Sequence, residues 1–100
     1  MIHLILVQPW TESEKGWGSR PDGYSLHLSE EDRDKYLKND TAARGSTVPN
    51  EYSFPDGEPY LTVATEGQLV HLKTAKSKAA GGVRYGSREP KPPRVTAGAY

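Results

Sequence analysis

Residues 17–32 constrain the fold more than any other stretch, because they combine a turn, a strand and a helix start. The Pro-Asp-Gly tripeptide at 21–23 is typical of a turn, since proline fixes φ and glycine tolerates a positive φ. Apolar and polar residues then alternate over 24–28, which is the period of a strand with one buried face. Ser29 can cap a helix, and Asp32 gives that helix an acidic first turn. The stretch therefore predicts a strand that leads directly into a helix.

The other expected elements follow from apolar runs and turn residues. The most apolar run has apolar side chains on both faces, which predicts a central strand that Pro9 ends. The expected order is a strand at 2–8, a loop at 10–20, a strand at 24–28, a helix from about 30 to 39 or slightly further, with Gly45 as its expected stop, an irregular segment at 45–59, and a hairpin of strands 60–65 and 68–74 around Glu66-Gly67.

The composition predicts one small domain with a thin core. Only 34% of the 100 residues are hydrophobic, the mean hydropathy is −0.77, and no cysteine is present to form a disulfide or a thiolate zinc site. The predicted fold class is α+β, with about four strands in a mostly antiparallel sheet and one surface helix over residues 1–74. Residues 75–100 are rich in glycine, proline and basic side chains, which predicts a flexible basic tail.

The net charge of zero conceals two halves of opposite charge. Residues 1–66 hold six basic and twelve acidic side chains, whereas residues 67–100 hold seven basic side chains and one acidic side chain. No apolar run approaches the ~20 residues that span a bilayer, and no basic segment precedes the apolar opening. We therefore expect a cytoplasmic protein with an acidic body and a basic tail.

The acidic half predicts a protein-binding surface. Aromatic side chains surrounded by carboxylates are typical of compact protein interfaces, and a basic partner would be their complement. The residues expected to form this surface are Trp17, Arg20, Tyr24, Glu30, Glu31 and Asp34. The alternative to a binding surface is that Trp17 packs on the helix and the charged side chains are only solvated.

The basic tail offers an alternative function, which is nucleic-acid binding. Arginine and lysine side chains neutralise phosphates, and a tyrosine stacks on bases. The residues expected to do so are Arg84, Tyr85, Arg88, Lys91 and Arg94. The alternative to nucleic-acid binding is a tail that only keeps the chain soluble, since such a tail has the same composition.

Catalytic and metal sites are expected to be absent. His3, His27 and His71 fall in predicted strands and could converge on one sheet face, but they lack a compact ligand spacing. A Ser25–His27–Asp22 triad can be assembled from the sequence, yet the chain contains no G-x-S-x-G motif. We therefore expect a protein without enzymatic activity, cofactor or metal.

The run Trp17-Gly-Ser-Arg-Pro-Asp-Gly-Tyr-Ser-Leu-His and the later Pro49-Asn-Glu-Tyr-Ser-Phe-Pro-Asp-Gly-Glu-Pro-Tyr resemble a group of small uncharacterised bacteriophage and prophage accessory proteins. The resemblance covers roughly residues 15–62 and not the tail. It transfers no activity and no site residue. It implies a non-enzymatic interaction protein, encoded by a phage, that modulates or inhibits a host protein machine such as a defence system or a nucleic-acid enzyme.

Overall fold

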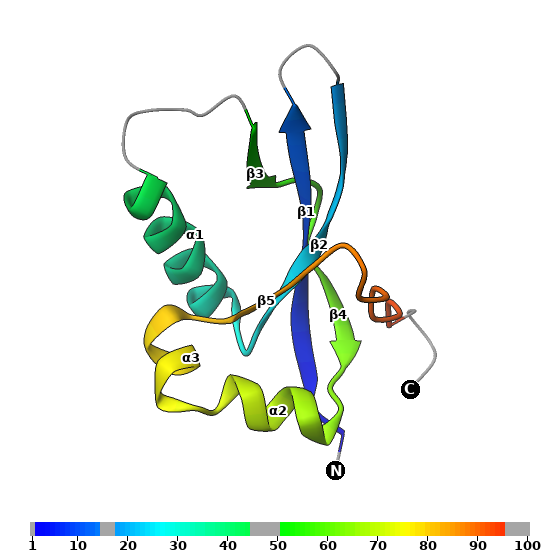
Figure 1. Ribbon diagram of the computed structural model, residues 1–100. Coiled ribbons are helices and arrows are strands. Elements are labelled where there is room, and N and C mark those ends of the chain that lie inside the picture. Colours follow the sequence, from blue (N-terminus) through cyan, green and yellow to red (C-terminus); the bar gives the residue numbers. More distant parts are fainter. Residues whose placement is uncertain (1, 15–17, 45–50, 96–100) are drawn as a thin grey trace.

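The computed structural model describes residues 2–14, 18–44 and 51–95, and it shows an α+β fold (Figure 1). The described elements are β1 (Leu4–Glu14), β2 (Gly18–His27), α1 (Glu30–Arg44), β3 (Glu51–Pro55), β4 (Tyr60–Val63), α2 (Glu66–Leu72), α3 (Ala75–Ala80) and β5 (Val83–Tyr85). The predicted fold class is confirmed, with five strands and three helices in the described residues. None of these helices is both long and apolar enough to cross a membrane.

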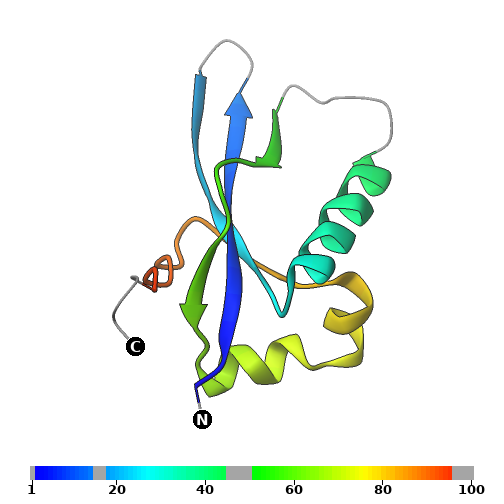
Figure 2. The ribbon, with the colours of Figure 1, turned by 180° about the vertical axis from the view of Figure 1, so that it is seen from behind.

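β1 is the centre of the sheet, and all described strand pairs are antiparallel. The strand order is β3-β1-β2-β5, and β4 also pairs with β1. β2 occupies one edge of β1, while β3 and β4 follow one another along the other edge (Figure 2). β4 pairs with Leu4–Val7 and β3 with Trp10–Glu14. The start of β1 therefore lies between β4 and the end of β2.

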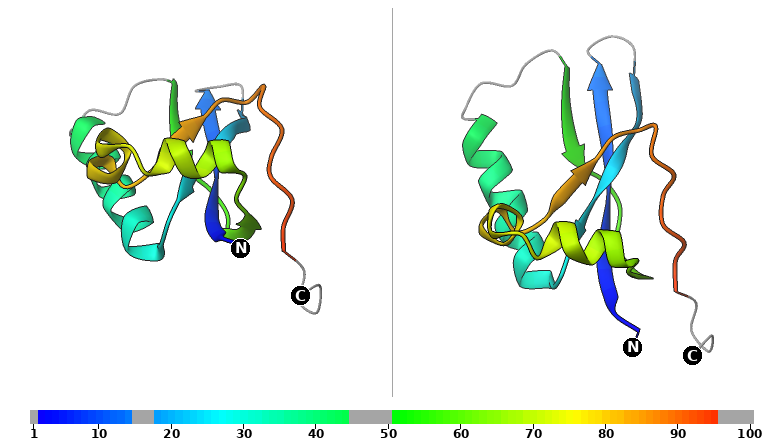
Figure 3. Two further views of the ribbon diagram at one scale, coloured as in Figure 1. Left: turned by 90° about the horizontal axis from the view of Figure 1, so that it is seen from below. Right: turned by 60° about the horizontal axis from the view of Figure 1, so that its bottom comes forward.

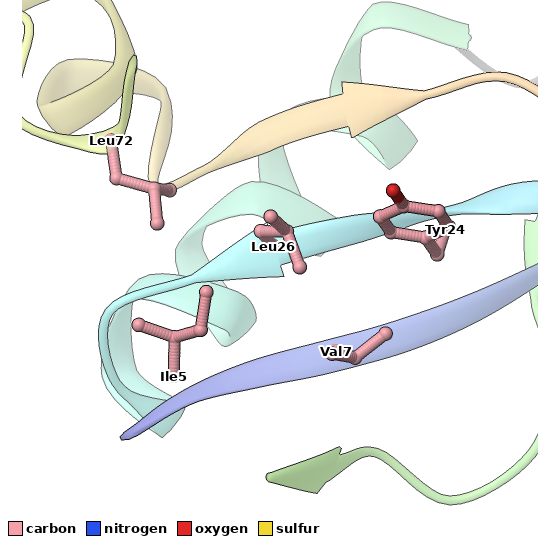
Figure 4. Close-up of a cluster of buried hydrophobic side chains, with 5 residues drawn as sticks. All are labelled: Ile5, Val7, Tyr24, Leu26 and Leu72. Carbon is pink, nitrogen blue, oxygen red and sulfur yellow. The ribbon is translucent and has the colours of Figure 1, made fainter. Parts of the chain in front are cut away.

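The apolar core lies on one face of the sheet (Figure 4). Side chains that alternate along β1 and β2 meet Leu72 at the end of α2, which lies across one end of the sheet (Figure 3). The buried cluster consists of Ile5, Val7, Tyr24, Leu26 and Leu72. Within the described residues this cluster has five buried side chains, which agrees with the thin core that the composition predicts.

The opposite face of the sheet is polar and aromatic, and α1 covers part of it. The Tyr36 ring of α1 meets the Trp10 ring edge-on at 6.2 Å and the His27 ring at 5.2 Å. Arg33 of α1 donates a 2.9 Å hydrogen bond to Gln8 Oε1. Because α1 has few apolar side chains, it is held to the sheet by rings and hydrogen bonds more than by aliphatic packing.

The prediction that Pro9 ends the first strand is wrong, because β1 continues to Glu14. The pairing register of β1 with β2 shifts between Pro9 and Thr11, and such an irregularity lets a strand accept a residue without an N–H donor. The Pro9 carbonyl still accepts a 3.0 Å hydrogen bond from the backbone N–H of Asp56. The described part of the predicted loop at 10–20 forms strand as well, and residues 15–17 lie outside the described residues.

The Pro-Asp-Gly tripeptide at 21–23 lies inside β2 and is not a turn between elements. Pro21 stands opposite Thr11 in the ladder, and Gly23 has a φ of 76°. A Cβ atom at Gly23 would lie 2.1 Å from the carbonyl oxygen of Tyr85. Glycine at position 23 therefore allows β5 to approach β2 closely. Such a close approach of two backbones requires glycine, just as a turn with a positive φ does.

The predicted helix is confirmed, since α1 runs from Glu30 to Arg44, the residue before the expected stop. Ser29 accepts a hydrogen bond from the Asp32 N–H at 3.1 Å, as a cap does. The predicted stop at Gly45 lies outside the described residues. In the segment expected to be irregular, residues 51–55 form β3 beside β1.

The predicted hairpin of 60–65 and 68–74 is wrong in its second half. Residues 60–63 form β4, but 66–72 form the helix α2. Thr65 and Gln68 form a capping box, in which each side chain bonds the backbone N–H of the other residue. The capping box and the three-residue spacing of the apolar side chains Leu69 and Leu72 favour a helix over the predicted strand.

Residues 75–85, which the composition predicts to be flexible, form α3 and β5. Gly81 ends α3 with a φ of 90°, and a Cβ atom there would lie 2.3 Å from the Asp32 carbonyl oxygen. Val83 and Tyr85 then pack against the core cluster. The glycines that suggested flexibility instead allow the backbone to pack closely.

Candidate protein-binding site

A concavity among the described residues lies beyond the start of α1, over the end of the sheet formed by β1 and β4. It encloses about 470 Å³. Leu4 and Leu61 lie on the same sheet face, and they remain 45% and 43% exposed because α1 does not cover them. The groove is lined by Leu4, Leu6, Leu28, Ser29, Glu30, Glu58, Pro59, Tyr60, Leu61, Arg94 and Val95. We refer to it as the β4 groove.

Charged side chains surround the β4 groove. Glu30 opens α1 next to its cap, and Glu58 precedes β4. Both carboxylates are exposed, and neither forms an ion pair with a described residue. Arg94 lies on the groove wall with its guanidinium carbon 4.7 Å from the centre of the Tyr60 ring. The groove thus combines an aliphatic floor with carboxylates at its rim.

The segment after β5 returns to the sheet near β4 (Figure 2). Its residues Arg94 and Val95 line the β4 groove. The Tyr60 hydroxyl donates a 2.7 Å hydrogen bond to the Pro92 carbonyl. The Val95 backbone N–H donates a 2.9 Å hydrogen bond to the Leu61 carbonyl. Residues 92–95 therefore run beside β4 without forming a regular strand with it.

The structure does not gather the predicted acidic and aromatic residues into one surface. Tyr24 is only 4% exposed and belongs to the core, because alternation along β2 turns it inward. Arg20 is paired with Glu12 at 2.9 Å near the start of β2, whereas Glu30 follows the end of that strand. Trp17 lies outside the described residues. The exposed members of the set on α1 are Glu30, Glu31 and Asp34, of which Glu30 lies at the β4 groove.

The residues predicted to bind nucleic acid are also divided. Arg84 donates hydrogen bonds to the Asp22 carboxylate and carbonyl, and its guanidinium carbon lies 4.2 Å from the centre of the Trp10 ring. Tyr85 stacks on Tyr24, with 5.1 Å between the ring centres. Both side chains serve the fold. Arg88 and Lys91 are exposed beyond β5, and Arg94 lies on Tyr60, so nucleic-acid binding stays a prediction for these three.

Ser25 and His27 are hydrogen-bonded, but in a buried chain of donors and acceptors and not in a catalytic triad. The Trp10 indole N–H donates to Ser25 Oγ at 2.8 Å, and Ser25 Oγ lies 2.7 Å from His27 Nε2. His27 Nδ1 lies 2.8 Å from the Gly81 carbonyl oxygen. Both Ser25 and His27 are 0% exposed, and Asp22 is bound to Arg84 and Ser53 instead. A substrate cannot reach this serine in the folded state.

Burial lowers the pKa of His27, and the nearby Arg33 cation acts in the same direction, while the Gly81 carbonyl and Asp32 oppose them. His27 is therefore neutral at pH 7. The three histidines do not converge, since His3 and His71 are exposed whereas His27 lies inside the structure. Among the described residues, no group of three histidine or carboxylate side chains could hold a metal ion.

Comparison with protein-family models, curated proteins and solved structures found no match to this chain. The β4 groove is therefore interpreted from its own chemistry.

Sequence reasoning missed the floor of the groove. The sequence predicts strands at Leu4 and Leu61, but nothing in it shows that β4 would lie beside the start of β1, beyond the reach of α1. A signal was present in the excess of apolar residues at 2–8, where both strand faces are apolar although the only predicted helix is short. One of those faces had to remain partly uncovered.

Proposed function

We propose that this chain is a non-enzymatic protein-binding protein that recognises an apolar and basic segment of its partner in the β4 groove. The observation that carries the proposal is the uncovered aliphatic sheet face at Leu4 and Leu61, which lies beside Glu30 and Glu58. Contiguous apolar surface rimmed by polar groups is typical of interaction sites. The enclosed volume of about 470 Å³ is sufficient for a few side chains of a partner.

The charges of the groove favour a basic partner. Two exposed carboxylates at the rim, with no ion-pair partner among the described residues, would gain a complement when a lysine or arginine of the partner binds. Residues 1–66 carry twice as many acidic as basic side chains, which would also attract such a partner at longer range. Rim charges contribute mainly to association rate and specificity, so the aliphatic floor would supply most of the affinity.

The sequence resemblance supplies the biological setting of this proposal. If the chain is a phage accessory protein, the partner is a protein of the bacterial host, and the chain modulates or inhibits it. The engagement of Arg84 and Tyr85 within the fold supports a protein partner over nucleic acid, because it removes two of the five side chains expected to contact phosphates and bases.

The test is affinity capture from bacterial lysate, with and without nuclease, followed by a binding measurement on the captured protein. The informative variant is Leu4→Thr/Leu61→Thr, which removes the aliphatic floor from exposed strand positions where threonine is well tolerated. The matched control is Val70→Thr, because Val70 is 65% exposed on α2 and does not line the groove.

We expect the unchanged chain and Val70→Thr to retain the same protein after nuclease treatment, and the double variant to lose it. Removing two contact side chains at an interface centre should weaken binding by at least about tenfold. Capture that disappears with nuclease, or that the double variant retains at full strength, would contradict the proposal.

A further inference from the structure

We propose that the outer edge of β4 binds an extended segment of the partner, in which a basic residue is followed directly by an aliphatic one, in the place that residues 92–95 now occupy. This inference rests on the proposed function and specifies how the partner binds. Strand addition to a sheet edge combines backbone hydrogen bonds with side-chain contacts on alternate residues. Both components are present at β4.

The backbone of β4 leaves alternate residues facing away from β1. Ala64 N–H donates to the His3 carbonyl at 2.8 Å, which places the inward-pointing groups of the ladder at even-numbered residues. The N–H and C=O groups of Leu61 and Val63 consequently point outward. In the described part of the chain, Val95 supplies the one backbone hydrogen bond to this outer edge, at the Leu61 carbonyl. The edge thus accepts an extended backbone and is only partly used.

Residues 94–95 show which side chains the edge selects. The Arg94 guanidinium lies over the Tyr60 ring at 4.7 Å, in cation–π geometry. Val95 is half-buried and lines the β4 groove beside Leu61. A basic side chain on the ring and an aliphatic side chain at the groove alternate as they do along a strand. The chain's own segment is therefore a template for the partner.

Residues 92–95 contact only part of the β4 groove. Leu4 and Leu61 remain close to half exposed with Val95 in place, and both rim carboxylates lack an ion pair among the described residues. A partner segment that continues the alternation would cover the leucines and place a further basic side chain near Glu58. It would gain contacts that the resident segment does not make, and so could displace it.

If a partner segment displaces residues 92–95, these residues compete with the partner for the outer edge of β4. While residues 92–95 occupy the edge, only the fraction of molecules in which they have moved away can bind the partner, and the apparent dissociation constant rises accordingly. A change that weakens the resident segment should therefore strengthen binding of a segment added in trans.

The probe is the chain's own segment as a free fluorescent peptide, Arg88-Glu89-Pro90-Lys91-Pro92-Pro93-Arg94-Val95. The variant is Val95→Pro in the full chain, which removes the N–H that bonds to Leu61 and keeps an extended backbone. The matched control is Val95→Ala, which retains the N–H. Peptide binding is measured by fluorescence anisotropy, and its location by amide chemical shifts of Leu61 and Val63.

We expect Val95→Pro to bind the peptide on the order of tenfold more tightly than the unchanged chain, with shifts at Leu61 and Val63. Val95→Ala, which keeps the N–H and loses only the side-chain contact, should fall between the two. Equal peptide affinity for all three proteins, or shifts confined to another surface, would overturn the strand mode. The proposed function has a separate test, since lysate capture through Leu4 and Leu61 can succeed with a partner segment that does not pair with β4. Trans binding of the peptide at Leu61 supports the edge site even if no lysate protein is captured, an outcome that counts against the proposed function alone.

Discussion

Buried hydrogen bonds link Trp10, Ser25 and His27, and together they determine which atom carries each shared hydrogen. The Trp10 indole can only donate, so Ser25 Oγ accepts from it. The Gly81 carbonyl can only accept, so the neutral His27 ring carries its hydrogen on Nδ1 and its Nε2 accepts the hydroxyl hydrogen of Ser25. Each group is satisfied only while the ring is neutral, because a proton on Nε2 would leave the serine hydroxyl to find another acceptor.

Stability should consequently fall in mild acid. Burial depresses the pKa of His27 in the folded state, so between that value and the ordinary value of about 6.5 the unfolded chain binds the proton more readily. The contribution of His27 is present above about pH 6.5 and is lost as the pH falls toward the folded-state pKa. We expect an NMR titration of the native protein to place the His27 midpoint below 6.5, with Nδ1 protonated in the neutral form.

The groups that face the His27 ring are Arg33, Asp32 and Tyr36 of α1 together with Ser25 and Gly81, and of these Asp32 alone favours the imidazolium by charge. A His27 midpoint at or above 6.5 would show that the ring is not desolvated as the structure requires.

At the scale of elements, the sequence predicted what depends on neighbours along the chain. The alternation at 24–28, the Ser29 cap and the helix that follows are all present in the structure. Predictions from glycine and proline are wrong where the role of these residues depends on contacts between elements that are distant in the sequence. Pro9 predicts a strand end and Gly81 predicts flexibility, but a register shift accommodates Pro9 within β1 and close packing against Asp32 requires Gly81.

The same limit applies to the candidate site. Glu30 was selected for its charge and does lie at the β4 groove, whereas Tyr24 was selected as an exposed aromatic and is buried. Residue type could identify a carboxylate near an interface. It could not show that β4 pairs with the start of β1, because that pairing joins residues more than fifty positions apart. The floor of the groove is a consequence of that topology.

The connection between α3 and β5 supplies a prediction about Gly82. A Cβ atom there would lie 2.4 Å from His27 Nδ1 and 2.5 Å from the Leu26 carbonyl oxygen, so Gly82→Ala must push the connection off the sheet. Overpacking of this kind costs about 1–3 kcal/mol of unfolding free energy, measured by urea denaturation. The loss should be accompanied by changed His27 ring resonances.

Gly67→Ala is the matched control, because a Cβ atom at Gly67 in α2 would meet only Thr65 Oγ1, at 4.0 Å. Alanine is the better helix former, so this variant should be neutral or more stable by up to about 1 kcal/mol. Equal destabilisation by the two variants would indicate that Gly82 is not packed against His27.

At the scale of the whole molecule, the acidic and basic halves of the sequence are not separate structural units. β5 from the basic half extends the sheet beside β2, and Arg84 bonds to Asp22 of the acidic half. Residues 92–95 return to β4 on the far side of the sheet order. The opposite charges of the two halves are therefore partly combined within one fold.

A chain that ends at Thr74 should fail to fold cooperatively. It lacks Val83 and Tyr85, which pack on the core, and the Gly81 carbonyl, without which His27 Nδ1 is buried and unpaired. Two apolar side chains at about 1.5–3 kcal/mol each, together with an unsatisfied donor at about 1–3 kcal/mol, approach the total stability of a small domain. A chain that ends at Glu89 retains all three groups and should keep a cooperative thermal transition by circular dichroism and dispersed amide resonances. A cooperative transition in the 1–74 chain would show instead that the sheet folds without β5, and that the basic half is an appendage as its composition first indicated.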